Sequence, residues 1–230
     1  MIRENLQEVE NNIVAACERS NRNAGDVTLI AVSKTKPIAM IEEAISAGKK
    51  EFGENKAQEM KEKYDTLPKD VKWHFIGHLQ TNKVKYVVGR AALIHSVDSL
   101  HLAEAIQREC EKREVQAEVL VEVNVAGEDS KFGVKPEETE NLVREIAKLS
   151  RIHVCGLMTI APFVENSEEN RWIFRKLHKL SVDISSKNID NIDMNVLSMG
   201  MTNDYEVAVE EGATHVRVGT GIFGERNYAV

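Results

Sequence analysis

The chain has little of what several large classes of protein require. Its three cysteines, Cys17, Cys110 and Cys155, are widely spaced, which predicts free thiols and a reducing compartment. None of its seven histidines forms the paired ligand spacing of a zinc helix, so we expect no metal. No apolar run approaches the roughly 18 to 20 residues of a membrane span. The N-terminus also lacks an apolar secretion core, so we expect a cytoplasmic protein with no membrane partner.

An excess of positive charge is also lacking. The 230 residues include 30 lysines and arginines against 37 aspartates and glutamates, which leaves a net charge of -7. Proteins that bind nucleic acid through bulk charge are basic, so we expect no nucleic-acid partner. Hydrophobic residues at 42% and charged residues at 29% exclude global disorder and predict a folded globular chain.

Linkers rich in proline or serine are absent too, which predicts a single domain over residues 1–230. A leading amphipathic helix is expected over residues 1–22, because apolar side chains recur there at spacings of three and four. These side chains are Ile2, Leu6, Val9, Ile13, Val14 and Cys17. A short apolar run rich in β-branched residues follows from Val27 and indicates a strand buried on both faces.

Strands and helices alternate along the rest of the chain. We expect eight strands, near residues 27–33, 50–53, 72–77, 92–97, 117–124, 152–159, 193–198 and 214–219. We expect helices near residues 38–47, 55–63, 81–88, 99–113, 137–149, 168–184 and 203–211. This order predicts a parallel sheet, either open and doubly wound or closed. The count of eight, with no G-x-G-x-x-G after the first strand, favours an α/β fold, a single-domain (β/α)8 TIM barrel with an extra N-terminal helix.

In such a barrel the functional residues follow the C-terminal ends of the strands. The last two strand ends are rich in glycines, which let the backbone approach a ligand, and in hydroxyl groups. These residues are Ser198, Gly200, Thr202, Gly219, Thr220 and Gly221. Loops after strands seven and eight are the usual phosphate site of this architecture, so we expect a phosphate here. The alternative is that these glycines serve only tight turns.

Two lysines follow the first strand. Lys34 would lie at the mouth of the barrel, where burial lowers the pKa of a lysine and supplies free amine for attack on a carbonyl. Lys36 is an equal candidate by local chemistry, although Pro37 holds it in an extended turn that leads away from the mouth. The alternative for either residue is a solvated loop lysine.

An arginine, Arg217, lies within the last strand on the face that it shares with His215 and Gly219. A buried unpaired charge is very costly, so this side chain needs acceptors or a ligand. It either meets a bound molecule or pairs inside the barrel with Glu122, and the residues leave both open.

With these residues in view, the sequence resembles the pyridoxal phosphate homeostasis proteins, whose fold matches the N-terminal barrel of alanine racemase. The matching stretches span nearly the whole chain and are residues 31–37, 52–55, 74–83, 156–158, 197–201 and 217–224. So many motifs in order make a chance match improbable. The resemblance implies a fold type III barrel that binds pyridoxal 5′-phosphate (PLP), acts in vitamin B6 homeostasis and delivers PLP to apoenzymes.

The resemblance also implies roles for individual residues. Lys34 would form a Schiff base, the internal aldimine, with PLP. Asn55 would lie near the cofactor ring, and Arg217 beside the pyridine nitrogen. The residues implied to hold the phosphate are Ser198, Met199, Gly200, Gly219 and Thr220. Thr202 stands where this family often has serine, and it keeps the hydroxyl.

An arginine beside the ring bears on reactivity. Its pKa stays above about 12, so it leaves the pyridine nitrogen unprotonated and weakens the cofactor as an electron sink. We therefore expect a carrier or regulator with no established catalytic residue, and not an enzyme. No exposed heptad stripe or extra domain demands a partner, so we also expect a monomer. Lys83 and Lys131 are candidates for a second cofactor site, with solvated lysines as the alternative.

Two other functions compete with the carrier. One is a single-domain PLP-dependent amino-acid racemase that uses Lys34 as its base. Alanine racemases add a C-terminal domain that supplies a second catalytic residue, whereas this chain stops at Val230. The other is a phosphate-binding barrel unrelated to PLP, such as an isomerase, because fold alone rarely determines function.

Overall fold

All eight expected strands are present in the computed structural model, which describes residues 1–128 and 132–225. They are β1 (Thr28–Val32), β2 (Glu51–Glu54), β3 (Lys72–Phe75), β4 (Ala91–Val97), β5 (Ala117–Glu122), β6 (Ile152–Met158), β7 (Ile192–Met201) and β8 (His215–Val218). Each strand pairs in parallel with the next, and β8 pairs with β1. The predicted closed barrel is confirmed, and the open sheet is excluded.

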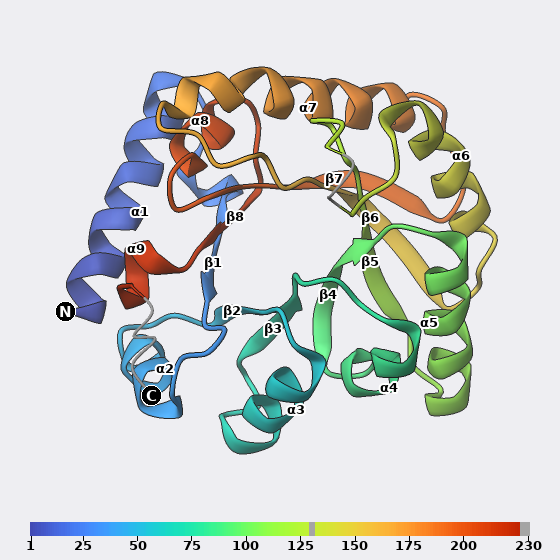
Figure 1. The fold of residues 1–230 in the computed structure, drawn as a ribbon, viewed down its shortest axis with the longest axis horizontal. Coiled ribbons are helices and arrows are strands. Elements are labelled where there is room, and N and C mark those ends of the chain that lie inside the picture. The colour runs from blue at the N-terminus through green and yellow to red at the C-terminus, as the bar shows by residue number, and fades with distance from the viewer. Residues whose placement is uncertain (129–131, 226–230) are drawn as a thin grey trace.

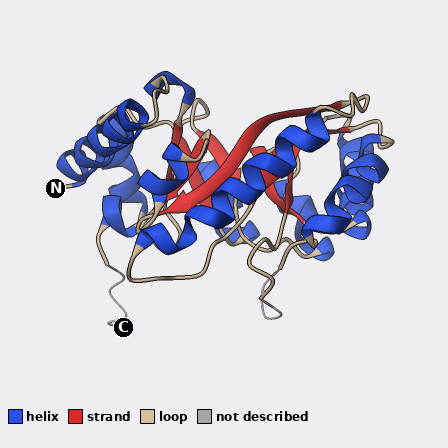
Figure 2. Cartoon of the chain, turned by 90° about the horizontal axis from the view of Figure 1, so that it is seen from above, coloured by secondary structure: helices blue, strands red, loops and turns tan. Residues whose placement is uncertain are grey.

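Helices surround the barrel and cover the outer faces of its strands (Figures 1 and 2). They are α2 (Ile38–Ser46), α3 (Ala57–Thr66), α4 (Val84–Val87), α5 (Leu100–Arg113), α6 (Pro136–Ala147), α7 (Arg171–Ser185), α8 (Tyr205–Glu210) and α9 (Thr220–Phe223). Short 3-10 turns cover Ala24–Asp26, Thr81–Lys83 and Ser167–Asn170. The sequence pattern did not indicate α9, because four residues that include a glycine show no helical periodicity.

The leading helix is α1 (Ile2–Arg19), and it lies beside α8 and α9 (Figure 1). Five of the six predicted apolar positions are buried there, and Val14 is the exception at 43% exposure. Val14 lies next to Ile13, which already faces the core, so it falls at the edge of the buried stripe. Within the described residues, no helix has the length and apolar character needed to cross a membrane.

The three cysteines are free and buried, as predicted. Burial raises the pKa of the Cys110 thiol to about 11 and that of Cys155 to about 12. Because the thiolate is the reactive form, these thiols are inert at neutral pH. In the part of the chain that the structure describes, no group of three or more His, Cys, Asp or Glu side chains is arranged to hold a metal ion.

Candidate functional site

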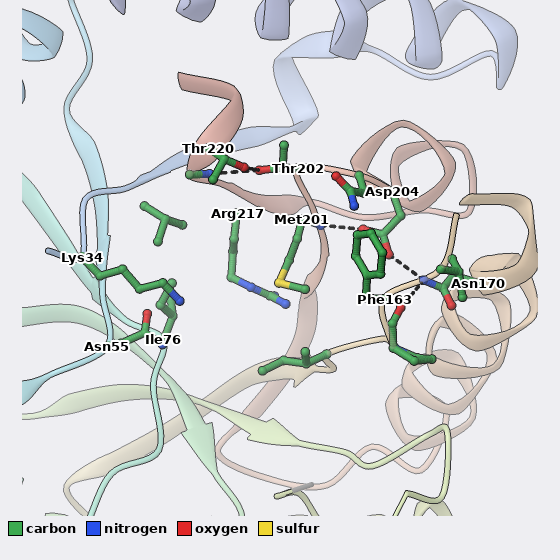
Figure 3. A pocket seen from close by; sticks show the side chains of 16 residues that line it. Lys34, Asn55, Ile76, Phe163, Asn170, Met201, Thr202, Asp204, Arg217 and Thr220 are labelled. Atoms are coloured by element: carbon green, nitrogen blue, oxygen red, sulfur yellow. Dashed lines mark hydrogen bonds between the residues drawn. The ribbon is translucent and has the colours of Figure 1, made fainter. Parts of the chain in front are cut away.

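A cavity of about 530 Å3 lies at the C-terminal ends of the strands. Its volume suits a small-molecule ligand, and its walls combine apolar residues with a few polar groups. Five of the predicted site residues line it together, namely Lys34, Asn55, Arg217, Gly219 and Thr220 (Figure 3). They come from the ends of β1, β2 and β8 and from α9, so barrel closure brings together residues that are far apart in sequence.

Lys34 directly follows β1, and its side chain reaches into the cavity beside Asn55 (Figure 3). Lys36 does not line this cavity. Its Nζ donates hydrogen bonds to the backbone carbonyls of Phe223, Gly224 and Glu225 at 3.2, 3.0 and 3.2 Å. The two lysines that were equal by local chemistry therefore have different roles, because Lys36 is tied to the end of α9.

A buried ion network lies beneath the loop that carries Lys34. At its centre is Lys63 of α3, whose side chain is 6% exposed. Its Nζ donates to the backbone carbonyl of Ser33 at 2.8 Å and to one carboxylate oxygen each of Glu54 and Glu59 at 2.7 Å. The Ser33 hydroxyl donates to the same Glu54 oxygen at 2.6 Å. A buried lysine with three acceptors thus joins β1, β2 and α3.

The network fixes the backbone on both sides of Lys34. Ser33 precedes Lys34 and is bound by Lys63, as described above. Thr35 follows it, and its amide donates to the Glu59 carboxylate at 2.6 Å. Thr35 has a φ of 64°, a left-handed conformation that is unfavourable for a β-branched residue. These hydrogen bonds therefore hold a strained turn that directs Lys34 toward the cavity.

Arg217 borders the cavity from β8 and is only 4% exposed. Its Nη1 donates to Ser198 Oγ at 2.5 Å, and its Nη2 donates to the Thr159 carbonyl at 2.8 Å. Burial lowers the pKa of Arg217 to about 10, below the value above about 12 expected from the sequence, and the side chain is still charged at neutral pH. The alternative partner Glu122 acts on it only through longer-range charge. A buried cation therefore faces the cavity with neutral acceptors behind it.

Glu122 itself supplies a test of the charge inside the barrel. It is 5% exposed, and burial, followed by the charge of Asp98, raises its pKa from 4.5 to about 7. A pKa that is higher in the folded state makes stability fall as pH rises from about 4.5 through 7. We therefore expect Glu122→Gln to be more stable than the wild type by about 2 to 3 kcal/mol at pH 8, and no more stable at pH 4.5.

Urea unfolding at the two pH values measures this difference. Glu118→Gln on the same strand is the control, since Glu118 is exposed. An equal difference between Glu122→Gln and the wild type at both pH values would contradict the prediction.

Three predicted phosphate residues do not line the cavity. Ser198 is fully buried inside the barrel behind Arg217, and Met199 is fully buried in the apolar core. Gly200 has a φ of 90°, and a Cβ at this position would lie 2.6 Å from the Cβ of Ala208. Glycine is therefore required by packing against α8. Contact of these three residues with a phosphate stays a prediction that the geometry does not favour.

The hydroxyl-rich end of the cavity is formed by the residues that directly follow Gly200. Met201, Thr202 and Asn203 line it, opposite Gly219 and Thr220. Thr202 Oγ1 accepts a hydrogen bond from the Gly219 amide at 3.3 Å and from the Thr220 hydroxyl at 3.2 Å. The sequence pattern missed Met201 and Asn203 because β7 extends to Met201, three residues beyond the expected end of the strand.

Two buried polar residues that the sequence did not single out also border the cavity. Asp204 is 5% exposed and accepts a hydrogen bond from the Met201 amide at 2.7 Å. Asn170 is 1% exposed and donates from Nδ2 to Asp204 at 2.8 Å and to the Pro162 carbonyl at 2.9 Å (Figure 3). They tie the loop after β6 to the loop after β7. No local pattern predicts this contact, because its partners are 34 residues apart.

The candidates for a second cofactor site lie elsewhere. Lys83 does not line the cavity, and its Nζ lies 5.8 Å from the centre of the Tyr86 ring. Lys131 falls outside the described residues. The second site therefore stays a prediction.

A parallel (β/α)8 barrel with a lysine after β1 and an arginine in β8 at one mouth defines a barrel of the alanine racemase type. The family "Alanine racemase, N-terminal domain" matches residues 5–227. The chain is 47% identical over 226 residues to the pyridoxal phosphate homeostasis protein of Aquifex aeolicus, and the match covers 98% of each chain. It is 36% identical over 233 residues to that of Escherichia coli, covering 99% of this chain and 98% of the relative. The chain therefore belongs to the pyridoxal phosphate homeostasis protein family.

Solved structures agree with this fold. PipY of Synechococcus elongatus with PLP bound has a TM-score of 0.83 and 33% identity, covering 97% of this chain and 100% of PipY. The alanine racemase of Clostridium difficile has a TM-score of 0.74 and 16% identity, covering 99% of this chain and 57% of the racemase. At that identity it shows the shared fold alone. The curated relatives carry the name of a homeostasis protein and not of an enzyme, as predicted.

Proposed function

We propose that this protein binds PLP in the cavity at the barrel mouth, holds it as a Schiff base on Lys34 and serves vitamin B6 homeostasis. The observation that carries the proposal is that Lys34 reaches into a cavity that Arg217 and a cluster of hydroxyl groups also line. The PLP bound to PipY, a relative 33% identical to this chain, supports it.

The residues of the cavity fit this cofactor. The Lys34 amine would add to the PLP aldehyde carbon, and loss of water would leave a carbon–nitrogen double bond. Thr202 Oγ1 accepts from the Gly219 amide and the Thr220 hydroxyl, so the hydrogen of the Thr202 hydroxyl would be a donor for a phosphate. Asn55 Oδ1 is buried with no hydrogen-bond partner among the described residues, and a ligand in the cavity would relieve that unsatisfied group.

Arg217 suits a protein that holds PLP rather than one that turns over amino acids. Beside the pyridine nitrogen, a charged guanidinium can donate a hydrogen bond but cannot accept one. It would leave the ring nitrogen unprotonated, and the ring would then withdraw electrons less strongly from a bound amino acid. We further propose that the protein is a cytoplasmic monomer and delivers PLP to apoenzymes.

Absorption spectroscopy of the purified protein with PLP tests the Schiff base. We expect a visible band that borohydride removes, and a stable adduct that mass spectrometry places on the peptide containing Lys34. An adduct on another residue would overturn the site assignment. Sustained racemisation of amino acids at ordinary enzyme rates, about 1 to 1000 per second, would overturn the carrier in favour of a racemase.

Transfer of PLP and oligomeric state need separate measurements. Mixing the loaded protein with a PLP-dependent apoenzyme should restore the activity of that enzyme faster than an equal concentration of free PLP does. Light scattering during gel filtration should give the mass of one chain. Restoration no faster than with free PLP would remove delivery from the proposal and leave binding in place.

A further inference from the structure

A chain of hydrogen bonds, buried except at its partly exposed Glu51 end, crosses the interior of the barrel. It begins at Arg217 beside the cavity and ends at Glu51, the first residue of β2, at the opposite end of the barrel. Its four links are Arg217 Nη1 to Ser198 Oγ at 2.5 Å, Ser198 Oγ to His95 Nδ1 at 2.8 Å, His95 Nε2 to His74 Nδ1 at 2.9 Å, and His74 Nε2 to Glu51 Oε2 at 2.8 Å. Ser198 and His95 are fully buried, and His74 is 4% exposed.

Hydrogen-bond chemistry gives this chain one direction when both imidazoles are neutral. Arg217 can only donate, so Ser198 accepts from it and directs its own hydrogen to His95 Nδ1. His95 then carries its proton on Nε2 and donates to His74 Nδ1. His74 in turn donates from Nε2 to the Glu51 carboxylate. Every donor in the chain has an acceptor, and the chain ends on a negative charge.

The charges along the chain support this direction. Burial alone would raise the pKa of Glu51, but hydrogen bonds from His74 and Lys72 lower it to about 2, so Glu51 is an anionic acceptor. Burial, the largest cause, holds the pKa of His95 well below its ordinary value. His95 is therefore neutral and has one proton to place.

Another titratable group that packs beside these hydrogen bonds is His215. Its ring centre lies 5.9 Å from that of His74 and 6.3 Å from that of His95. Its Nδ1 is within hydrogen-bond distance of Thr214 Oγ1, at 3.0 Å. Burial lowers the pKa of His215 to about 4, so it adds no charge to the chain at neutral pH.

We propose that Glu51 is a remote positioning residue for the cofactor site, acting through His74, His95 and Ser198 to orient the Arg217 guanidinium. This inference rests on the proposed binding of PLP beside Arg217. A carboxylate can only accept, so it determines which way the hydrogen bonds run. A glutamine can accept or donate at the same place, so Glu51→Gln removes that preference.

If these hydrogen bonds ran in the opposite direction, Arg217 would be held less well. His95 would donate from Nδ1 to Ser198, which would then accept from both His95 and Arg217. The hydroxyl hydrogen of Ser198 would lose its acceptor, and Ser198 would become a poorer partner for Arg217. The guanidinium would be held less firmly against the cavity, although it lies far from the substituted residue.

The first test needs no cofactor. Nitrogen-15 NMR of the apoprotein distinguishes the two tautomers of a neutral histidine. We expect the Nε2–H tautomer for His95 in the wild type and a growing Nδ1–H population in Glu51→Gln. The proposal would be overturned if His95 of the wild type is in the Nδ1–H form. It would also be overturned if Glu51→Gln leaves the tautomer of His95 unchanged.

The second test measures PLP binding and its visible spectrum. Glu51→Gln should weaken PLP affinity by about threefold to tenfold and shift the absorption band of bound PLP. Glu118→Gln removes an exposed carboxylate from β5, which does not pair with β2, and it should change neither. Equal behaviour of Glu51→Gln and Glu118→Gln would overturn the proposal.

A double-variant cycle separates a relay from a general loss of stability. Ser198→Ala cuts the chain next to Arg217, so adding Glu51→Gln should weaken PLP affinity no further. Additive effects would mean that Glu51 acts by another route. Ser198→Ala also tests the chain if Glu51→Gln folds poorly. Failure of the wild type to bind PLP would instead reject the proposed function. The NMR result would still show whether Glu51 sets the direction of the hydrogen bonds.

Discussion

Lys34→Ala should abolish covalent capture of PLP. The side chain of Lys34 reaches into the cavity, whereas Lys36 is bound to three backbone carbonyls at the end of α9. Without the Lys34 amine, the PLP aldehyde has no nucleophile held beside it. Borohydride treatment followed by mass spectrometry should show labelling fall from near one PLP per chain to background. The visible band should be replaced by that of free PLP.

Lys36→Ala is the matched control, because it removes an amine from the same loop. It should keep the adduct on Lys34, and it should affect only the anchoring of α9. An adduct that persists in Lys34→Ala, on Lys36 or elsewhere, would show that the cavity does not direct the reaction. Loss of the adduct in both variants would mean that each substitution disturbs the loop. The loss in Lys34→Ala would then not show that the Lys34 amine forms the adduct.

Lys63→Met should lower the free energy of unfolding by about 3 to 5 kcal/mol, because removing one partner of a buried ion pair leaves the other charge uncompensated. Glu54, fully buried, would lose the hydrogen bond from Lys63 at 2.7 Å. Methionine fills a similar volume, so the effect reports charge rather than a cavity. Urea unfolding measures it.

Lys61→Met on the same helix is the control. Lys61 pairs with Asp65 at the surface, where both side chains are more than a third exposed, so its loss should cost less than about 0.5 kcal/mol. Adding Glu54→Leu to Lys63→Met should recover part of the stability, because it removes the orphaned carboxylate. Equal losses for Lys61→Met and Lys63→Met would contradict the predicted role of the buried network.

The same variant has a predictable pH dependence. Burial raises the pKa of Glu54, and the charge of Lys63 opposes that rise. Without Lys63 the folded-state pKa rises further above the unfolded value, so stability is lost as pH increases. The difference between Lys63→Met and the wild type should therefore be larger at pH 8 than at pH 5. Because the network holds the turn around Lys34, Schiff base formation should also slow.

Local pattern was sufficient to predict the barrel and to single out candidate side chains at its strands. Alternating apolar runs and amphipathic stretches indicate eight strand–helix units, since each strand and helix has its own periodicity. Functional groups in this architecture follow the strands, so Lys34 and Lys36 were equal candidates after the first strand and Arg217 was a candidate within the last. The family resemblance, and not local pattern, chose Lys34. Local pattern did not predict the end of β7, which continues to Met201 and buries Ser198 behind Arg217.

What the sequence determined by itself is therefore the order of the strands and helices and which chemical groups follow them. Only the tertiary structure decided which of those groups meet. It turned Lys34 toward the cavity and Lys36 away from it, placed Lys63 beneath their loop, and joined Arg217 to Glu51 through the barrel. The physical reason is that such contacts depend on closure of the barrel, which joins residues from different strands. Local periodicity carries no record of partners that lie 21 or 103 residues away, as His74 and Ser198 lie from His95.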